Sequence, residues 1–108
     1  MAKKNLKEQI GREEAERTGG EKYILKLFVT GMLPNSAHAI VNIKAICAKY
    51  LKGRHELEII DIYQQPSLAF SEDIIAVPLL IKKAPLPEER LLGDLSDVGR
   101  VMKALDLI

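Results

Sequence analysis

The chain of 108 residues is poor in cysteine and in aromatic side chains. It has no Trp, its aromatic residues make up 5% of the total, and Cys47 is its single cysteine. One cysteine excludes an intramolecular disulfide and fits a protein of a reducing compartment. We therefore expect a cytoplasmic protein with an aliphatic core and without a dithiol of its own.

The sequence also lacks an excess of charge of either sign and a long apolar run. Its 16 Lys and Arg side chains stand against 15 Asp and Glu side chains, which gives a formal net charge of +1. This balance argues against a nucleic-acid partner, which usually requires a strongly basic face. No run approaches the roughly 20 apolar residues that cross a bilayer, and the N-terminal segment is too polar for a signal peptide. The sequence thus predicts neither nucleic-acid binding nor a membrane partner.

Composition divides the chain into a polar segment, residues 1–20, and a domain, residues 21–108. The polar segment mixes Lys, Arg and Glu with few larger aliphatic residues and ends at Gly19-Gly20. We interpret it as a tail with little to bury, and a regulatory or oligomerising arm is the alternative. The remaining residues suffice for one compact domain and leave no room for two.

The first half of the domain predicts a β-α-β unit. The run Tyr23–Val29 is rich in aliphatic and aromatic residues and favours an interior strand, and Gly31 followed by Pro34 is typical of a turn into a helix. That helix has one broad apolar face and reaches Gly53, where a C-terminal cap is expected. A second strand is predicted over Leu57–Tyr63. Two strands joined by a helix of this length should be parallel, with a right-handed crossover.

The second half predicts a short helix, two strands and a final helix, so that the whole order is β-α-β-α-β-β-α. The expected ranges are Pro66–Ile75 for the helix, Ala76–Ile81 for a strand, Arg90–Gly93 for an edge strand and Val98–Leu105 for the last helix. Asp94 and Ser96 are expected to cap that last helix. The Val77–Pro78 bond is either a cis bond facing the helix entrance, as in thioredoxins, or an ordinary trans bond at a strand start.

A thioredoxin-type domain presents its redox dithiol between the end of a strand and the start of a helix. Residues 23–36 have this strand, turn and helix start but contain no cysteine. Cys47 falls on the apolar face of the following helix, which predicts a packed thiol rather than a reactive one. His38 and His55 lie far apart without neighbouring ligands, so we expect surface residues and no metal site. No P-loop, dinucleotide fingerprint or Ser/His/Asp arrangement is present. We expect no catalytic residue, no cofactor and no enzymatic activity, and a function in binding.

Several short motifs in a fixed order resemble the KaiB family of circadian clock proteins. They are Tyr23-x-Leu25-Lys26-Leu27-Phe28-Val29-x-Gly31-x-x-Pro34-Asn35-Ser36, Ile60-Asp61, Ala76-x-Pro78, Gly93-Asp94-Leu95-Ser96 and Leu105-Asp106-Leu107. The resemblance implies a thioredoxin-like α/β domain without enzymatic activity, which binds the ring of the ATPase KaiC and regulates its cycle. It also implies a homo-oligomeric resting form, a dimer or tetramer, in which the second half takes an alternative, metamorphic arrangement.

The resemblance further implies roles for individual residues. The implied residues are Lys82, Lys83, Arg90 and the exposed strand near Pro78 for docking on the ATPase, Ala104 and Asp106 for the balance between the two arrangements, and Tyr23 and Asp94 for subunit contacts in the resting form. Each set also has a plainer interpretation. The lysines could be solvated residues that protect a sheet edge, Tyr23 a strand-entry aromatic, and Asp94 part of a helix cap.

Two departures from the family pattern bear on these roles. Ala104 stands where family members usually have Gly, and Ala favours a helix interior by about 0.8–1 kcal/mol, which should bias the chain toward the thioredoxin-like arrangement. Asp73 stands where members that bind the ATPase commonly carry Lys, so either the partner has complementary changes or binding is lost. The alternative function is therefore that of a KaiB-fold stress-response protein that no longer binds a KaiC-like partner.

Overall fold

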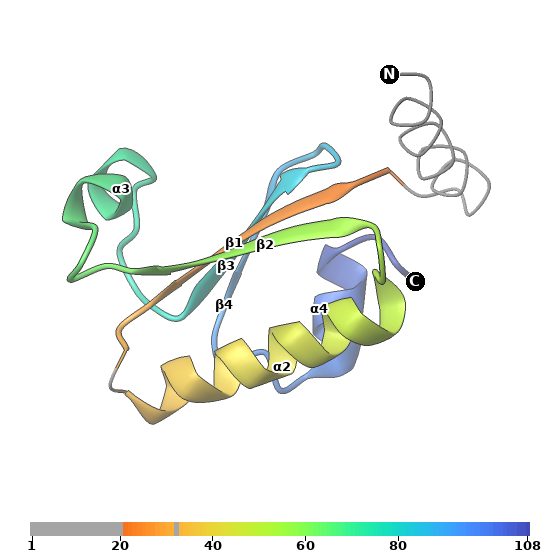
Figure 1. Cartoon of the computed structure of the whole chain (residues 1–108), viewed down its shortest axis with the longest axis horizontal. Coiled ribbons are helices and arrows are strands. Elements are labelled where there is room, and N and C mark those ends of the chain that lie inside the picture. The colour runs from red at the N-terminus through yellow and green to blue at the C-terminus, as the bar shows by residue number, and fades with distance from the viewer. Residues whose placement is uncertain (1–20, 32) are drawn as a thin grey trace, which may run out of the picture.

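The computed structural model describes residues 21–31 and 33–108, and Figure 1 shows their arrangement. Along the chain the elements are β1 (Tyr23–Val29), α2 (Pro34–Tyr50), β2 (His55–Asp61), α3 (Pro66–Ser71), β3 (Leu79–Ala84), β4 (Glu89–Leu92) and α4 (Val98–Ala104). The predicted order of strands and helices is confirmed. The interpretation of residues 1–20 as a tail lies outside the described residues.

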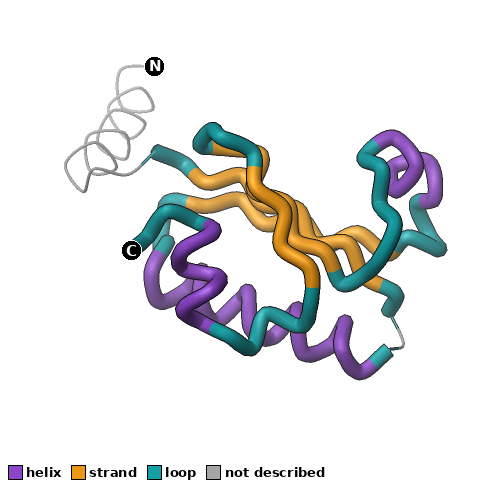
Figure 2. Tube along the Cα trace, turned by 180° about the vertical axis from the view of Figure 1, so that it is seen from behind, coloured by secondary structure: helices purple, strands orange, loops and turns teal. Residues whose placement is uncertain are grey.

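The four strands form one sheet in the order β2-β1-β3-β4. β1 pairs in parallel with β2, as predicted, and antiparallel with β3, which in turn pairs antiparallel with β4. Helices α2 and α4 lie along one face of the sheet, whereas α3 lies at one end on the other side, as Figures 1 and 2 show from opposite directions. The second half of the chain therefore has the arrangement expected of a thioredoxin-like domain.

Alternation of side chains along β1 creates two hydrophobic clusters, one on each face of the sheet. Leu25 and Leu27 point into the larger cluster, which α2 and α4 cover. Phe28 points to the opposite face and belongs to a smaller cluster with residues of β2, β3 and the α3 segment, namely Ile60, Leu79, Ile81, Leu68 and Ile74. Because α3 itself has no fully buried residue, it is held by less apolar packing than α2 or α4.

The bounds of β2, β3 and β4 differ from the prediction, and β4 spans Glu89–Leu92 rather than Arg90–Gly93. β2 lies slightly earlier in the chain than expected, because the carboxylate of Asp61 accepts a hydrogen bond from the Tyr63 amide and turns the chain there. β3 begins at Leu79 rather than Ala76, because Pro78 has no N–H with which to extend the ladder. The Pro78 carbonyl still accepts a hydrogen bond from Gly93 at 2.9 Å.

α3 also ends earlier than predicted, at Ser71 rather than Ile75. Asp73 adopts the left-handed conformation with φ of 55°. The amide of Ile74 donates to the carbonyl of Ala69, and the amide of Asp73 donates to that of Phe70. These two bonds form a Schellman motif, which satisfies the last carbonyls and stops the helix.

α4 begins at a different cap from the one predicted. Its N-cap is Asp97, whose side chain accepts from the Arg100 amide at 3.1 Å, and neither Asp94 nor Ser96 has this role. The Asp94 carboxylate instead accepts from the Ser96 amide within the preceding turn. Asp94, Ser96 and Asp97 are all residue types that can cap a helix. Only Asp97 directly precedes the first helical residue, so only its side chain reaches the free N–H groups of α4.

Candidate functional site

The end of β1 and the start of α2 meet at a tightly bonded turn. The amide of Thr30 donates to the buried hydroxyl of Ser36 at 3.1 Å, and the amide of Gly31 donates to the Asp61 carboxylate at 3.1 Å. A Cβ atom at position 31 would lie 2.7 Å from that carboxylate, so any other residue would force the Asp61 side chain to move. The turn has the place of a thioredoxin dithiol, but residues 30–36 contain no cysteine.

Pro78 lies next to this turn. The register between Phe28 of β1 and Leu79 of β3 brings the segment before β3 beside the end of β1. The Val77–Pro78 peptide bond is cis, which resolves the open choice between cis and trans in this arrangement. Pro78 is buried, however, and this corrects the expectation that an exposed strand at this residue contacts a partner.

Cys47 is the one cysteine of the chain, and it is fully buried on the inner face of α2. Burial raises the pKa of its thiol to about 11. A thiol of this kind stays protonated near neutral pH and is shielded from solvent, which is unfavourable for redox or nucleophilic chemistry. The prediction of a packed rather than reactive cysteine is confirmed.

Lys82 is not the exposed cation that the sequence suggested. Its side chain is 1% exposed, because β3 is an interior strand and residue 82 points toward the helices rather than along an edge. Its Nζ atom has no hydrogen-bond partner among the described residues, and the carboxylate of Asp106 lies 4.0 Å away. In this arrangement Lys82 is therefore not exposed for docking and does not protect a sheet edge.

Lys83 and Arg90 lie on the opposite face of the sheet and contact Glu72, which follows α3. Lys83 Nζ donates to the Glu72 carboxylate at 2.5 Å, and Arg90 donates to the Glu72 carbonyl oxygen at 2.6 Å. Glu88 contacts Lys83 on its other side at 3.0 Å. The hydrogen bond from Lys83 lowers the pKa of Glu72, and the same bond raises the pKa of Lys83. Both predicted docking cations are thus already engaged by carboxylates, and sequence reasoning missed Glu72 as their partner.

Tyr23 is buried within the chain instead of being available for a subunit contact. Its hydroxyl donates to the carbonyl of Leu105 at 2.7 Å, which ties the start of β1 to the end of α4. Desolvation by burial raises the pKa of this hydroxyl. In this arrangement the aromatic ring belongs to the larger hydrophobic cluster, and the subunit contact expected of Tyr23 in the resting form stays a prediction.

The two fold-balance residues lie at that same end of α4. Ala104 is the last residue of the helix, and Asp106 follows with φ of 59°. The amide of Leu107 donates to Met102, and the amide of Asp106 donates to Lys103, so α4 ends in a second Schellman motif. Their position at a helix end is compatible with a role in the fold balance, which stays a prediction.

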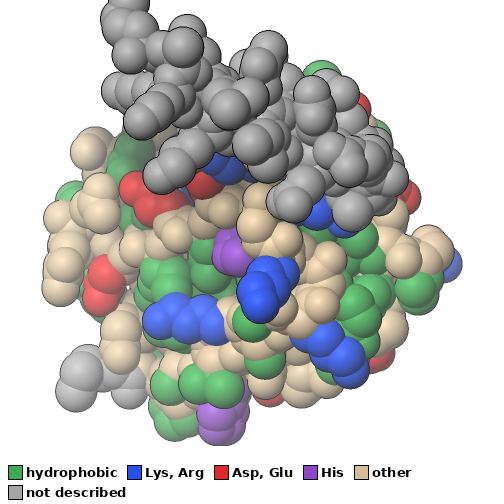
Figure 3. Space-filling view, turned by 45° about the vertical axis from the view of Figure 1, so that its right-hand side comes forward, with side chains coloured by type: hydrophobic (Ala, Val, Ile, Leu, Met, Phe, Trp, Pro, Cys, Tyr) green, Lys and Arg blue, Asp and Glu red, His purple; other side chains and the backbone are tan. Residues whose placement is uncertain are grey.

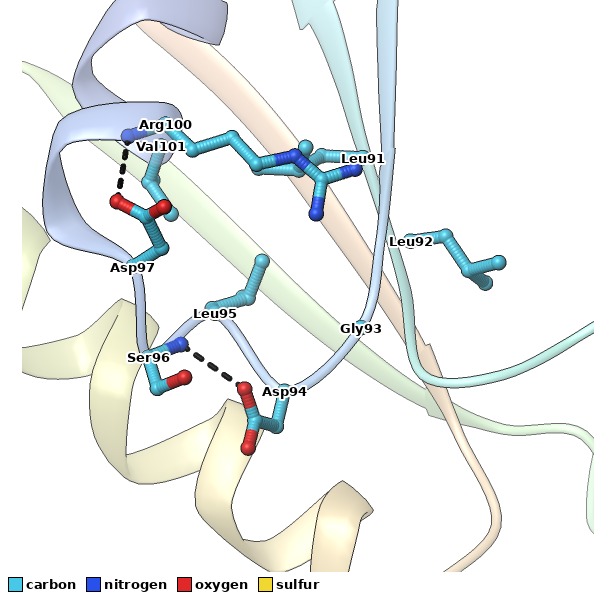
Figure 4. Close-up of a pocket in the computed structure, with 9 residues that line it drawn as sticks. All are labelled: Leu91, Leu92, Gly93, Asp94, Leu95, Ser96, Asp97, Arg100 and Val101. Atoms are coloured by element: carbon cyan, nitrogen blue, oxygen red, sulfur yellow. Dashed lines mark hydrogen bonds between the residues drawn. The ribbon is translucent and has the colours of Figure 1, made fainter.

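Asp94 lies in the turn between β4 and α4. Its hydrogen bonds from Ser96 lower the pKa of its carboxyl group, and its carbonyl accepts from Asn42 of α2 at 2.9 Å. Figure 4 shows the shallow pocket beside this turn, with the side chain of Arg100 extending across it toward Leu91. Asp94 is half-buried, and its role in subunit contact stays a prediction.

Three large apolar side chains around α3 face solvent, and sequence reasoning did not single them out. They are Tyr63, Phe70 and Ile75, with exposed fractions between 81 and 96%. We refer to these three residues as the α3 apolar group. Phe70 could have been found from the helical period, because it lies two residues beyond the inward-facing Leu68 and so on another side of the helix.

Other kinds of site find no support in residues 21–31 and 33–108. No group of three His, Cys, Asp or Glu side chains converges as a metal site needs, within those ranges. His38 is exposed, whereas His55 is half-buried, with Nδ1 2.8 Å from the Leu51 carbonyl oxygen. Among the described helices, none has the length and apolar character to cross a membrane.

The family model and the most similar relatives identify the same protein family. The KaiB domain matches residues 26–107. The circadian clock oscillator protein KaiB of Prochlorococcus marinus subsp. pastoris is 45% identical over 86 residues, covering 80% of each protein. The protein of the same name from Synechococcus elongatus is 44% identical over 86 residues, covering 80% of this chain and 84% of that protein.

Solved structures similar to this chain share its fold at lower sequence identity. The N-terminal domain of Synechococcus elongatus SasA has a TM-score of 0.64 at 24% identity, covering 82% of this chain and 88% of that one. The germline-specific thioredoxin Deadhead of Drosophila melanogaster has a TM-score of 0.66 at 12% identity, covering 88% and 89%. The predicted thioredoxin-like fold is confirmed.

Proposed function

The chain belongs to the KaiB family, and from this premise we propose that it is a non-enzymatic regulatory protein that binds a KaiC-like ATPase and modulates its cycle. Its curated relatives are named circadian clock oscillator proteins, which supports a role in a clock or a related timing process. The proposal includes a cytoplasmic location and a homo-oligomeric resting form, a dimer or tetramer.

One observation carries the proposal of binding rather than catalysis. The thioredoxin-like turn at residues 30–36 has no thiol, and the single Cys47 is buried with a raised pKa. A thioredoxin-like domain without an accessible thiol can hold an extended partner but cannot carry out thiol–disulfide exchange, so it is suited to recognition. The proposed mechanism is a shift of population, in which the partner binds one arrangement of the second half and holds it.

The α3 apolar group is the docking surface that we propose for the ATPase. Exposed apolar side chains that gather in one region of a surface mark interaction sites, and these three come from the short segment of residues 63–75. Lys83 and Arg90 adjoin this group through their contacts with Glu72, so they remain candidates for its polar rim. Lys82 and Pro78 are buried and are not part of it.

Binding can be tested by size-exclusion chromatography with a KaiC-like ATPase from the same genome, in the presence of ATP. We expect co-elution, and we expect Phe70→Ser to weaken the complex about tenfold or more, since buried aromatic side chains dominate interfaces. Leu86→Ser is the matched control, because Leu86 is also 81% exposed but lies in the β3–β4 hairpin. Absence of any complex at micromolar concentrations would contradict the function, whereas equal weakening by both variants would contradict only the surface.

The second candidate is a stress-response protein that keeps the KaiB fold but has no ATPase partner. The pairing of Lys83 and Arg90 with Glu72 favours it, since little unpaired positive charge is left beside α3. This candidate predicts a single arrangement of the chain in solution and a stress phenotype on gene deletion that does not depend on any KaiC-like gene.

A further inference from the structure

Among the described residues, the cations that form ion pairs and the exposed cations of the helical layer lie in different parts of the fold. The ion pairs among residues 21–31 and 33–108 involve Lys22, Lys82, Lys83 and Arg90, which lie in or next to the sheet strands. The cations exposed on the helical layer have no ion pair within those ranges, and they are Lys44, Lys49, Lys52, Arg100 and Lys103. Among the described residues, exposed cations without an ion pair therefore lie over α2 and α4, whereas the remaining unpaired cations, Lys26 and Arg54, are half-buried.

This concentration follows from an absence of acidic residues in the helices. α2 has 17 residues and contains neither Asp nor Glu, and the same holds for α4. Attraction to the helix dipole explains a basic residue in a last turn, such as Lys49. It does not explain Lys44 in the middle of α2, or a first turn without an acidic residue or a side-chain cap.

The outer face of α2 combines these cations with an apolar centre. Val41 is 65% exposed, and its neighbours at helical spacing are the exposed Ala37, Ala45 and Ala48. By helical geometry, Lys44 and Lys49 project from opposite flanks of this line. Figure 3 shows one side of the molecule, on which separate Lys and Arg side chains lie among hydrophobic and other residues.

We propose that the outer face of α2 docks an acidic amphipathic helix of a partner protein. Val41 would contact the apolar side of that helix, and Lys44 and Lys49 would pair with carboxylates on its two flanks. A protein helix fits better than a nucleic acid, because a phosphate backbone would leave the apolar centre around Val41 exposed and because the chain has a net charge of only +1. This surface lies on the opposite side of the sheet from the α3 apolar group and does not depend on its function.

A designed peptide provides a direct test. The probe is a 20-residue helix with Leu on one side and Glu on its flanks, titrated into the ¹⁵N-labelled full chain at low and at high salt. We expect shifts concentrated on residues 37–49, and we expect the affinity to fall as salt screens the exposed charges. Neutralising Lys44→Gln and Lys49→Gln together should weaken binding roughly threefold to tenfold, the sum of two exposed ion pairs.

Matched controls distinguish binding at this surface from a non-specific attraction between the basic side chains and any acidic peptide. Lys22→Gln removes an exposed cation outside the helical layer and should leave the affinity unchanged, and Val41→Asp should abolish binding although the residue is exposed and the fold is kept. A scrambled peptide of the same composition that binds equally well would overturn the proposal. It would equally be overturned if duplex DNA or anionic vesicles bound this face more tightly than the peptide, or if the α2 shifts appeared on raising the protein concentration alone.

Discussion

Substitution of Glu72 by Gln should loosen α3 without unfolding the rest of the chain. α3 has no fully buried residue and packs on the sheet through few side chains, chiefly Leu68. The bond between Glu72 and Lys83 is therefore a large part of what fixes it. The Glu72→Gln change keeps the size of the side chain and the hydrogen bond from Arg90 to the Glu72 backbone carbonyl, and it removes the longer ion pair between Arg90 and the Glu72 carboxylate at 3.9 Å.

The size of the effect follows from the burial of the pair. A hydrogen bond between charged groups contributes about 1.5–3 kcal/mol when well shielded. The side chains of Glu72 and Lys83 are 19% and 28% exposed, so partial solvation reduces this to about 1–2 kcal/mol. A local loss of that size corresponds to roughly a fivefold to thirtyfold rise in the population in which α3 is detached.

Hydrogen exchange measures this population directly. The Ile74 amide, which donates to Ala69 at the end of α3, should exchange roughly fivefold to thirtyfold faster in Glu72→Gln. Amides in β1 should be unchanged. Glu88→Gln is the matched control, because Glu88 also contacts Lys83 but lies in the β3–β4 hairpin and touches no residue of α3. Unchanged exchange at Ile74, or equal acceleration in the two variants, would refute the reasoning.

The same pair gives a pH dependence with a definite sign. The pKa of Glu72 is lowered in the folded chain from its ordinary value of 4.5. Its contribution to stability is therefore complete above pH 4.5 and is lost as the pH falls through the folded pKa. NMR shifts of α3 should move in this acidic range in the parent chain and not in Glu72→Gln.

Further substitutions test the roles assigned to Lys82, Tyr23 and Ala104, and a labelling experiment tests Cys47. Lys82→Met should raise the melting temperature, because it replaces a buried ammonium without a hydrogen-bond partner by an apolar side chain of similar length; a large fall would contradict this. Tyr23→Phe should destabilise the chain by about 1–1.5 kcal/mol in urea titrations, because it removes a buried hydroxyl donor; no change would show that the bond to α4 is unimportant. Cys47 should react with a thiol reagent only as fast as the chain opens, and rapid labelling in the native state would restore a thiol enzyme as a candidate. Ala104→Gly should shift the conformer populations seen by NMR away from the thioredoxin-like arrangement, and identical populations would refute a fold-balance role.

The first half of the fold could be predicted well because local signals agree there. Tyr23–Val29 has a strand pattern, Gly31 and Pro34 mark the turn, and one continuous apolar face defines α2. The predicted strand β1 coincides with the observed one. Errors appear where a side chain changes the course of the backbone, as at Asp61, whose carboxylate ends β2 by capping the following turn.

The candidate site was harder to predict, because the exposure of a strand's side chains depends on the order of the strands in the sheet. Lys82 and Lys83 are adjacent in sequence, and nothing local distinguishes them. β4 pairs with the edge of β3 that would otherwise be free, so β3 is an interior strand. Because successive side chains of a strand point to opposite faces of the sheet, Lys82 points into the core and Lys83 points to the opposite face. Tyr23 is similar, because its hydroxyl partner at Leu105 is 82 positions away and no local pattern reveals it.

The two helices of the second half share a way of ending that bears on the stability of this arrangement. Both α3 and α4 are short, and each ends in a Schellman motif with an Asp, at 73 and at 106, in the left-handed position that glycine favours. Asp tolerates that conformation better than most residues but still at a cost that glycine avoids. Local preference therefore does little to hold either helix. What holds them is tertiary: Glu72 binds α3 to the sheet, and the end of α4 is held by the Tyr23 hydroxyl and by the buried Val101, Met102 and Leu105. The population shift proposed above would therefore have to break the Glu72 and Tyr23 contacts and the apolar packing of α4.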